Sequence, residues 1–275
     1  MLTFVGLGLY DERSITVEGR AALRAADRAF AEFYTSDLVG TSVAALAAHH
    51  DVEIEVRDRA GVERDPEPVL DAAAREDVCF LAAGDAMVST THVDLRLRAE
   101  KRGIDTRVVH GVSASSAVPA LCGLQNYRFG KAVTLPFPDA HGGDGVPPSV
   151  VESVESNRDR GLHTLVYLDI TADDAQRERR AWRRDGSTTR GDYMTADVAA
   201  GLLAEEWRDA LGVAVARAGS PDPVVSADRL SALADRGFGG PLHALVLPGE
   251  LHHVEREALE RLADAPAAAL DDRTS

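Results

Sequence analysis

Lysine is almost absent from this chain, which has only Lys101 and Lys131 among its 275 residues. The other 28 of its 30 basic side chains are arginines (30 − 2), and 45 acidic residues give a formal net charge of −15. Contacts to the phosphates of nucleic acids and anionic membranes need clustered Lys and Arg. The charge balance therefore argues against a nucleic-acid partner and against a membrane partner.

Long apolar runs and cysteines are also scarce. No uninterrupted apolar stretch reaches about 18 residues, the length that a membrane-spanning helix needs, and the first residues enter a strand pattern without the charged region of a secretory signal. Cys79 and Cys122 lie in apolar stretches, which is typical of buried free thiols. We therefore expect a soluble, cytoplasmic protein.

Short apolar runs alternate with amphipathic stretches along the whole chain, a pattern typical of α/β organisation. Residues 1–112 are expected to form an N-terminal α/β domain with a mostly parallel, doubly wound sheet, and residues 113–275 a C-terminal α/β domain. The expected strands are 2–9, 29–34, 52–56, 77–83, 105–110, 162–170, 212–217 and 243–247. The expected helices are 16–28, 41–49, 68–75, 91–102, 111–121, 150–160, 194–206, 227–235 and 251–263.

Gly6 and Gly8 follow the first expected strand and suggest a dinucleotide-binding turn. The fingerprint requires a third glycine three residues after Gly8, and that position is Asp11. The pattern therefore argues against an NAD or FAD site and indicates only a tight turn with close backbone approach to a ligand.

Two further strand ends carry polar residues. Asp85 follows an apolar strand, where open α/β sheets bind ligands, but it could equally stabilise a turn or cap the helix beginning near residue 89. Ser113 and Ala114 lie where the next strand gives way to a helix. Backbone N–H groups there can bind an anion, although a simple serine N-cap explains the same residues.

The histidines and the arginine cluster carry weaker signals. His49 and His50 are adjacent in sequence, as are His252 and His253, so each pair points to different helix faces, and we predict no metal site. His92 is expected to be a structural or surface residue. For the arginine-rich segment 177–184, we favour a solvated, charge-balanced surface segment over a docking surface for an anionic partner.

Nine short segments together resemble the diphthine synthase family, the S-adenosyl-L-methionine-dependent methyltransferases of diphthamide biosynthesis. In chain order they are 5–13 (VGLGLYDER), 31–36 (AEFYTS), 84–92 (GDAMVSTTH), 129–131, 161–165, 168–170, 193–195, 216–220 and 248–252. The family commonly has Gly-Asp-Pro where this chain has Gly84, Asp85 and Ala86. The acidic, lysine-poor composition also resembles that of proteins from salt-loving archaea.

The resemblance implies the tetrapyrrole-methylase fold, with two α/β domains, the cofactor S-adenosyl-L-methionine in the interdomain cleft, and a homodimer. It implies translation elongation factor 2 as the protein substrate, whose modified histidine carries the amino group that is methylated to give diphthine. The residues that correspond to the family's cofactor contacts are Leu9, Asp85, Val88, Ser113, Ala114, Leu168, Ala218 and His243.

The implied chemistry needs no strong base, so we name no catalytic residue. Its product carries a permanent positive charge, which an aromatic face or a carboxylate can stabilise. The candidates, all near expected strand ends, are Tyr10, Asp11, Phe33, Tyr34 and Asp169. Two alternatives stay open: a methyltransferase of the same fold acting on a tetrapyrrole or ribosomal RNA, and a non-catalytic cofactor-binding module.

Overall fold

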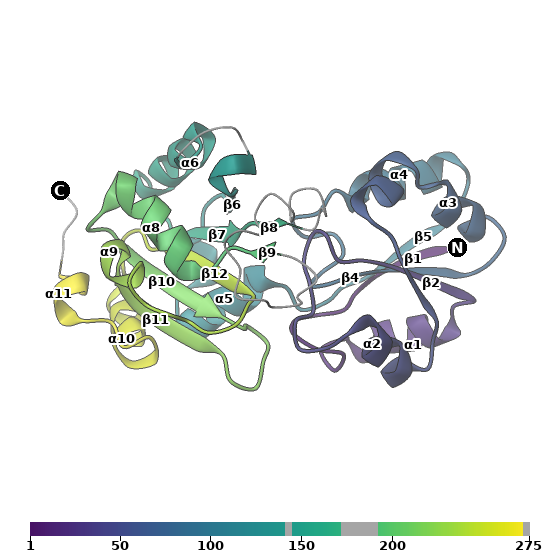
Figure 1. Cartoon of the computed structure of the whole chain (residues 1–275), viewed down its shortest axis with the longest axis horizontal. Coiled ribbons are helices and arrows are strands. Elements are labelled where there is room, and N and C mark those ends of the chain that lie inside the picture. Colours follow the sequence, from purple (N-terminus) through teal and green to yellow (C-terminus); the bar gives the residue numbers. More distant parts are fainter. Residues whose placement is uncertain (141–144, 172–191, 272–275) are drawn as a thin grey trace. The chain divides into compact units, whose positions relative to one another are not determined.

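The computed structural model describes residues 1–140, 145–171 and 192–271, drawn in colour in Figure 1. Two compact units make up the chain, Met1–Ala114 and Ser115–Ser275. The division expected from the sequence, after residue 112, lies two residues before this boundary. The arginine-rich segment 177–184 lies outside the described residues.

The first unit is built on a five-stranded sheet with the order β3-β2-β4-β1-β5. Its strands are β1 (Leu2–Gly6), β2 (Arg28–Glu32), β3 (Ile54–Val56), β4 (Val78–Ala82) and β5 (Thr106–Val109). Every pair in this sheet is parallel, so the predicted doubly wound arrangement is confirmed. The central strands β1 and β4 are buried along their whole length, which explains why they read as continuous apolar runs.

Helices cover both faces of this sheet, with α1 and α2 on one face and α3 and α4 on the other (Figure 1). Their bounds are α1 (Val17–Ala25), α2 (Val43–His50), α3 (Glu67–Ala73) and α4 (His92–Lys101), with a π-helical turn at Ala60–Arg64. Side-chain caps fix two of the starts, because Thr16 accepts a hydrogen bond from the backbone of Gly19, and Ser42 from that of Ala45. These helices match the predicted ones to within a few residues.

The second unit contains a five-stranded sheet with the order β11-β10-β12-β7-β6. Its strands are β6 (Val133–Leu135), β7 (Thr164–Leu168), β10 (Leu211–Ala216), β11 (Val224–Arg229) and β12 (His243–Leu247), while β8 (Ile170–Thr171) pairs with β9 (Asp192–Tyr193). Only the β6–β7 pair of the larger sheet is parallel; the other three pairs are antiparallel. The described helices are α5 (Ala114–Cys122), α6 (Pro148–Arg158), α8 (Ala196–Trp207), α9 (Leu230–Leu233), α10 (His253–Leu262) and α11 (Ala267–Leu270).

One predicted helix, 227–235, is wrong. Residues 224–229 instead form the edge strand β11, which pairs with β10 from Leu211 opposite Arg229 to Ala216 opposite Val224. The spacing of Leu230 and Leu233 resembles a helix, but it supports only the four-residue α9. The backbone ladder along β10 outweighs the weak helical preference of the preceding residues, and a sequence pattern does not contain that partner. The short strand β6 also escaped prediction.

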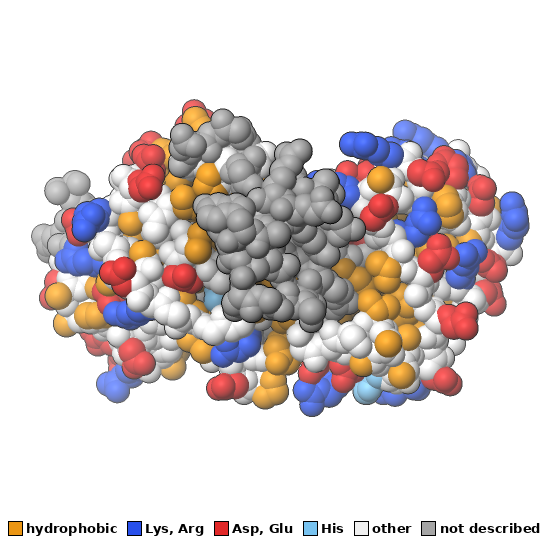
Figure 2. All heavy atoms as spheres, viewed as in Figure 1, with side chains coloured by type: hydrophobic (Ala, Val, Ile, Leu, Met, Phe, Trp, Pro, Cys, Tyr) orange, Lys and Arg blue, Asp and Glu red, His pale blue; other side chains and the backbone are white. Residues whose placement is uncertain are grey.

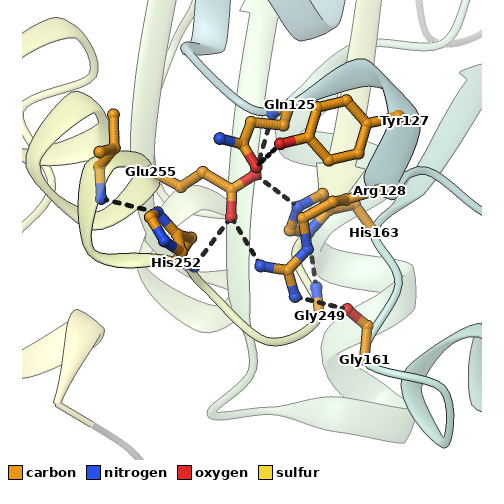
Figure 3. A network of polar contacts seen from close by, with 9 residues as sticks. Gln125, Tyr127, Arg128, Gly161, His163, Gly249, His252 and Glu255 are labelled. Carbon is orange, nitrogen blue, oxygen red and sulfur yellow. Dashed lines mark hydrogen bonds and ion pairs between the residues drawn. The ribbon is translucent and has the colours of Figure 1, made fainter.

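A buried carboxylate connects three separate segments of the second unit (Figure 3). The fully buried Glu255 accepts hydrogen bonds from the backbone N–H groups of Gln125 and His252, each at 2.9 Å. The ring of His163 lies 3.1 Å from the same carboxylate, and the guanidinium of Arg128 lies 3.3 Å from it. His163 in turn accepts a hydrogen bond from the backbone of Gly249 at 3.0 Å. The carboxylate therefore fixes the loop after α5, the start of β7 and the start of α10.

The surface mixes charges of both signs, as Figure 2 shows for one face. Many arginines pair with the abundant carboxylates; Arg102, for example, contacts both Glu67 and Asp71. Such exposed pairs contribute little individually to stability. Among the described residues, none of the helices has the length and apolar character needed to cross a membrane.

We predict that Glu255→Ala lowers the free energy of unfolding by about 3 kcal/mol, because removal of one member of a buried charged network leaves its partners unsatisfied. Urea unfolding monitored by circular dichroism measures this change. Glu257→Ala on the same helix is the matched control, since Glu257 forms only an exposed pair with Arg261. An equal effect of the two substitutions would contradict the assigned role of Glu255.

Candidate functional site

The carboxyl ends of β1, β4 and β5 lie at one edge of the first sheet, where the three strands are neighbours. The chain leaves β1 for β2, beyond β4, and later leaves β4 for β5, beyond β1. The connections of two adjacent strands thus run in opposite directions, which defines the topological switch point where open α/β sheets bind ligands. This edge is the candidate site of the first unit.

The backbones at this edge are in direct contact. Gly8 and Gly84 exchange two hydrogen bonds, with N–O distances of 3.0 Å and 2.7 Å. A Cβ atom on Gly6 would lie 2.6 Å from the nitrogen of Gly111, and a Cβ atom on Gly111 would lie 2.3 Å from the carbonyl oxygen of Gly84. Neither position can hold a side chain without separating the strand ends. The glycines therefore bring the loops after β1, β4 and β5 together.

Asp85 joins two of these loops. Its Oδ1 atom accepts the backbone N–H of Met87 at 2.9 Å, while Oδ2 lies 2.8 Å from Nδ1 of His110 and accepts the N–H of Gly111 at 3.2 Å. Asp85 is 4% exposed. It does stabilise a turn, but it does not cap the following helix, because α4 begins only at His92. Its carboxylate thus determines the shape of the edge.

The other predicted contacts of the first unit lie at the same edge. Leu9 follows β1, and its N–H donates to the hydroxyl of Ser14 at 2.9 Å. Val88 lies in the turn after Asp85 and is 39% exposed, an apolar side chain open to solvent. Ser113 and Ala114 lie where β5 gives way to α5. The structure therefore brings Leu9, Asp85, Val88, Ser113 and Ala114 to three neighbouring strand ends.

The remaining predicted contacts gather at one end of the second sheet. His243 begins β12 and pairs with Ala216, the last residue of β10. Ala218 lies in the turn directly after β10, and the N–H of Arg217 donates to the carbonyl of Leu242 at 2.8 Å. Leu168 ends β7, and the β7–β12 register, with Tyr167 opposite Ala244, places it beside His243.

His243 uses both ring nitrogens within the second unit. Nδ1 accepts the N–H of Ala196 at 3.0 Å, at the first turn of α8, and Nε2 lies 2.9 Å from the carbonyl oxygen of Gly240. The ring is therefore neutral, with its proton on Nε2, because a carbonyl can only accept. Burial lowers the pKa of His243 below its ordinary value.

Sequence and structure comparisons agree on one family. The family model "Tetrapyrrole (Corrin/Porphyrin) Methylases" matches residues 1–234. A diphthine synthase of Halorubrum lacusprofundi is 66% identical, with 99% of this chain and 100% of that protein covered, and one of Halobacterium salinarum is 67% identical, with 98% and 100% covered. The chain belongs to the diphthine synthase family. A crystal structure of diphthine synthase superposes with a TM-score of 0.84 at 36% identity, covering 98% of both chains.

The residues at the first edge fit the cofactor that the diphthine synthase resemblance implies. A Cβ atom on Gly84 would meet nothing within 4 Å, so the backbone beside Asp85 faces open space. Val88 and Val112 offer exposed apolar surface, at 39% and 45% exposure, against which a purine or a thioether can pack. The apolar parts of the ligand therefore have a counterpart at this edge.

In this member of the diphthine synthase family, the side chains expected to face a cationic product mostly bond to or pack against other residues of the chain. Asp11 is paired with Arg13, whose hydrogen bond lowers the pKa of the Asp11 carboxyl. The guanidinium of Arg59 lies 5.1 Å from the centre of the Tyr34 ring. Asp169 accepts the N–H of Phe137 at 2.9 Å. Tyr10 packs against Gly40, and Phe33 packs against the apolar core of the first unit.

No group of three or more potential ligands for a metal ion occurs among the residues that the structure describes.

The sequence did not reveal three other residues at the first edge. His110 and Gly111 bond to Asp85, and Nδ1 of His92, which is 1% exposed, lies 2.8 Å from the carbonyl oxygen of Ala86. Of the two roles expected for His92, structural or surface, the structural one is confirmed. The sequence signal that could have pointed to a buried polar arrangement here was Glu32, an acidic residue at the end of an apolar strand.

We predict that acidification below about pH 6.5 destabilises the protein. Burial lowers the pKa of both His163 and His243, so the unfolded chain binds protons that the folded chain does not. The free energy of unfolding is then highest above the ordinary histidine pKa and falls as the pH decreases through it. His243→Gln, which can replace both hydrogen bonds, should reduce this slope by up to about 1.4 kcal/mol per pH unit. Urea titrations between pH 5 and 8 test this, and an unchanged slope would contradict it.

Proposed function

We propose that this protein is an S-adenosyl-L-methionine-dependent N-methyltransferase. It methylates the amino group of the 3-amino-3-carboxypropyl-modified histidine of translation elongation factor 2, giving diphthine in diphthamide biosynthesis. The observation that carries the proposal is identity of 66–67% to diphthine synthases over nearly the whole chain, which includes all of the segments around the glycine-rich edge.

We propose that Leu9, Asp85, Val88, Ser113 and Ala114 bind the cofactor in the first unit, and Leu168, Ala218 and His243 in the second. Support comes from their positions at strand ends and from the Gly84 backbone facing open space. Asp85 and Leu9 contribute through the loops they fix, since their polar atoms already bond within the unit. Val88 contributes apolar contact.

S-adenosyl-L-methionine, when bound, supplies a methyl group that is already activated as a sulfonium. The chain therefore has to orient the acceptor amine and exclude water, and orientation alone can lower a barrier by about 7–11 kcal/mol. The glycine contacts and the Asp85 carboxylate make the first edge rigid before any ligand arrives. A fixed edge of this kind is what such catalysis requires.

The acceptor amine attacks only when it is neutral. Free α-amino groups have a pKa near about 8, so a useful fraction is neutral near pH 7, and a neighbouring positive charge increases that fraction. Water can take the released proton, and we assign no catalytic base. The permanent charge of a fully methylated product would meet Tyr10 or Phe33 more readily than Asp11, which Arg13 already neutralises.

We further propose three transfers per acceptor, a cytoplasmic location, a homodimer, and adaptation to high salt. The last is supported by the net charge of −15 with two lysines and by the haloarchaeal sources of the relatives at 66–67% identity. Molar salt would screen the repulsion among surface carboxylates to within a few ångströms.

Elongation factor 2 carrying the aminocarboxypropyl-histidine precursor should gain mass in methyl-sized steps when incubated with this protein and S-adenosyl-L-methionine. Intact-mass spectrometry before and after incubation measures the number of steps directly. Unmodified elongation factor 2, ribosomal RNA and a precorrin serve as parallel acceptors. Transfer to RNA or to the tetrapyrrole alone would overturn the proposal in favour of another methyltransferase of this fold. Binding of the cofactor without transfer to any acceptor would indicate a non-catalytic cofactor-binding module.

Asp85→Ala should weaken binding of S-adenosyl-L-methionine by at least roughly tenfold, about 1.4 kcal/mol, because the loops after β4 and β5 lose their common acceptor. Isothermal titration calorimetry provides the dissociation constant, and thermal unfolding shows whether the variant is folded. Asp94→Ala is the matched control, because Asp94 is exposed on α4 and pairs only with Arg98. Unchanged affinity in folded Asp85→Ala would restrict Asp85 to a turn-stabilising role.

A further inference from the structure

One histidine at the first edge keeps a ring nitrogen free for a ligand. His110 directly follows β5, and its Nδ1 atom forms a hydrogen bond of 2.8 Å with Oδ2 of Asp85. A carboxylate only accepts hydrogen bonds, so the ring donates from Nδ1, and the lone pair of the neutral ring belongs to Nε2. This second nitrogen has no polar partner among the residues that the structure describes.

Asp85 fixes the orientation of this ring. The carboxylate is 4% exposed and is itself held by the backbone, because Oδ1 accepts the N–H of Met87 and Oδ2 that of Gly111. No arginine or lysine of the described part of the chain lies at ion-pair distance from it, so His110 is its partner side chain. A carboxylate that accepts from one ring nitrogen determines both the direction of an imidazole and which nitrogen stays an acceptor.

Exposure separates His110 from two other histidines that lie beside buried carboxylates. Its side chain is 77% exposed, whereas those of His92, beside Glu32, and His163, beside Glu255, are fully buried. Each of the two buried rings packs against a phenylalanine, with centroids 5.1 Å and 5.2 Å apart. A ring as exposed as that of His110 contributes little packing, and it is open to a ligand from solvent.

The proposed reaction releases protons beside this ring. An amine attacks only when it is neutral, and each methyl transfer converts it into an ammonium ion. For another transfer to the same acceptor, one proton has to leave the nitrogen first. His110 bonds to Asp85 and lies shortly before Ser113 in the loop after β5, and both of these residues are proposed cofactor contacts. A group that binds next to these contacts can reach the free nitrogen of His110.

We propose that His110 is a catalytic residue, which takes a proton through Nε2 from the ammonium form of the acceptor. The N–H bond of the ammonium ion breaks and leaves its electron pair on the amine nitrogen, while the lone pair of Nε2 forms the new N–H bond and the ring becomes imidazolium. Water, which can take the proton where no base is present, receives it here from the exposed ring. The neutral ring is then ready for the next transfer. The proposal deepens the function given above and rests on it for the identity of the acceptor.

Nitrogen-15 NMR of the imidazole rings tests for the free lone pair without any ligand. At about pH 9, where histidine side chains are ordinarily neutral, His110 should carry its proton on Nδ1 and leave Nε2 unprotonated. The signals are assigned by their loss in His110→Asn. His243, whose proton lies on Nε2, should give the opposite pattern in the same spectrum. A proton on Nε2 of His110 would overturn the proposal, because no lone pair would then be available to the acceptor.

Single-turnover transfer at saturating S-adenosyl-L-methionine tests the catalytic role. His110→Asn can keep a donor to Asp85 but has no basic nitrogen, so each transfer should slow by a factor on the order of 100, as loss of a general base commonly causes. The dissociation constant of S-adenosyl-L-methionine should stay unchanged. Intact mass of elongation factor 2 over time measures the rates, and calorimetry measures the affinity. His253→Asn, the same change at an exposed histidine of α10, is the control and should match the wild-type protein.

Added imidazole separates a chemical role from a structural one. His110→Ala removes the exposed ring and leaves room for a small base beside Asp85. Its transfer rate should therefore rise with the concentration of imidazole, while that of the wild-type protein should not. A slow variant that imidazole does not accelerate would overturn the proposal, because a free base does not repair a structural defect.

The outcomes also separate this proposal from the proposed function. Equal transfer rates of the wild-type protein and His110→Asn would overturn the role of His110 while the methyltransferase function stands. A loss of transfer explained entirely by weaker binding of S-adenosyl-L-methionine would overturn it as well, because His110 would then be a cofactor contact. Failure of the wild-type protein to methylate elongation factor 2 is a different result, which would overturn the proposed function together with its base.

Discussion

The contact between the glycine loops after β1, β4 and β5 is the constraint on which the candidate site depends. Gly6 and Gly111 lie so close to the neighbouring strand ends that a Cβ atom added to either would meet backbone atoms at 2.3–2.6 Å. Side chains at these positions would force the three strand ends apart. Because they meet, Asp85 can reach the backbone of Gly111 and the ring of His110. The shape of the edge is therefore a property of the backbone, which side chains then stabilise.

Buried carboxylates stabilise the loops of both units in the same way. Asp85, Glu32 and Glu255 each accept several hydrogen bonds, mostly from backbone N–H groups of distant or neighbouring loops, and each has a histidine at hydrogen-bond or ion-pair distance. A carboxylate with two oxygens can satisfy several donors at once, which a neutral side chain of similar size cannot. A chain rich in acids and poor in lysine thus uses a few of its carboxylates inside, where they determine loop geometry.

The sequence predicted the first unit better than the second. Its strands are buried and parallel, so each appears as a continuous apolar run, and the helices between them have clear amphipathic spacing. In the second unit, β11 is an edge strand whose residues are half exposed, and β6 has three residues. Such strands are stabilised by their partners in the sheet, and a pattern along one segment carries no information about a partner far away in sequence.

By itself the sequence determined the α/β class, the position of most helices and strands, and the family, because these depend on local apolar spacing and on short ordered segments. Only the tertiary structure decided what the polar residues do. His243 and Asp85 are adjacent to strand ends in any interpretation, but their bonds to Ala196, Gly240, Met87 and Gly111 depend on segments that folding brings together. The Glu32–His92 pair joins residues 60 positions apart (92 − 32). Buried polar groups take the partners that the folded chain places within reach, and sequence spacing does not specify that proximity.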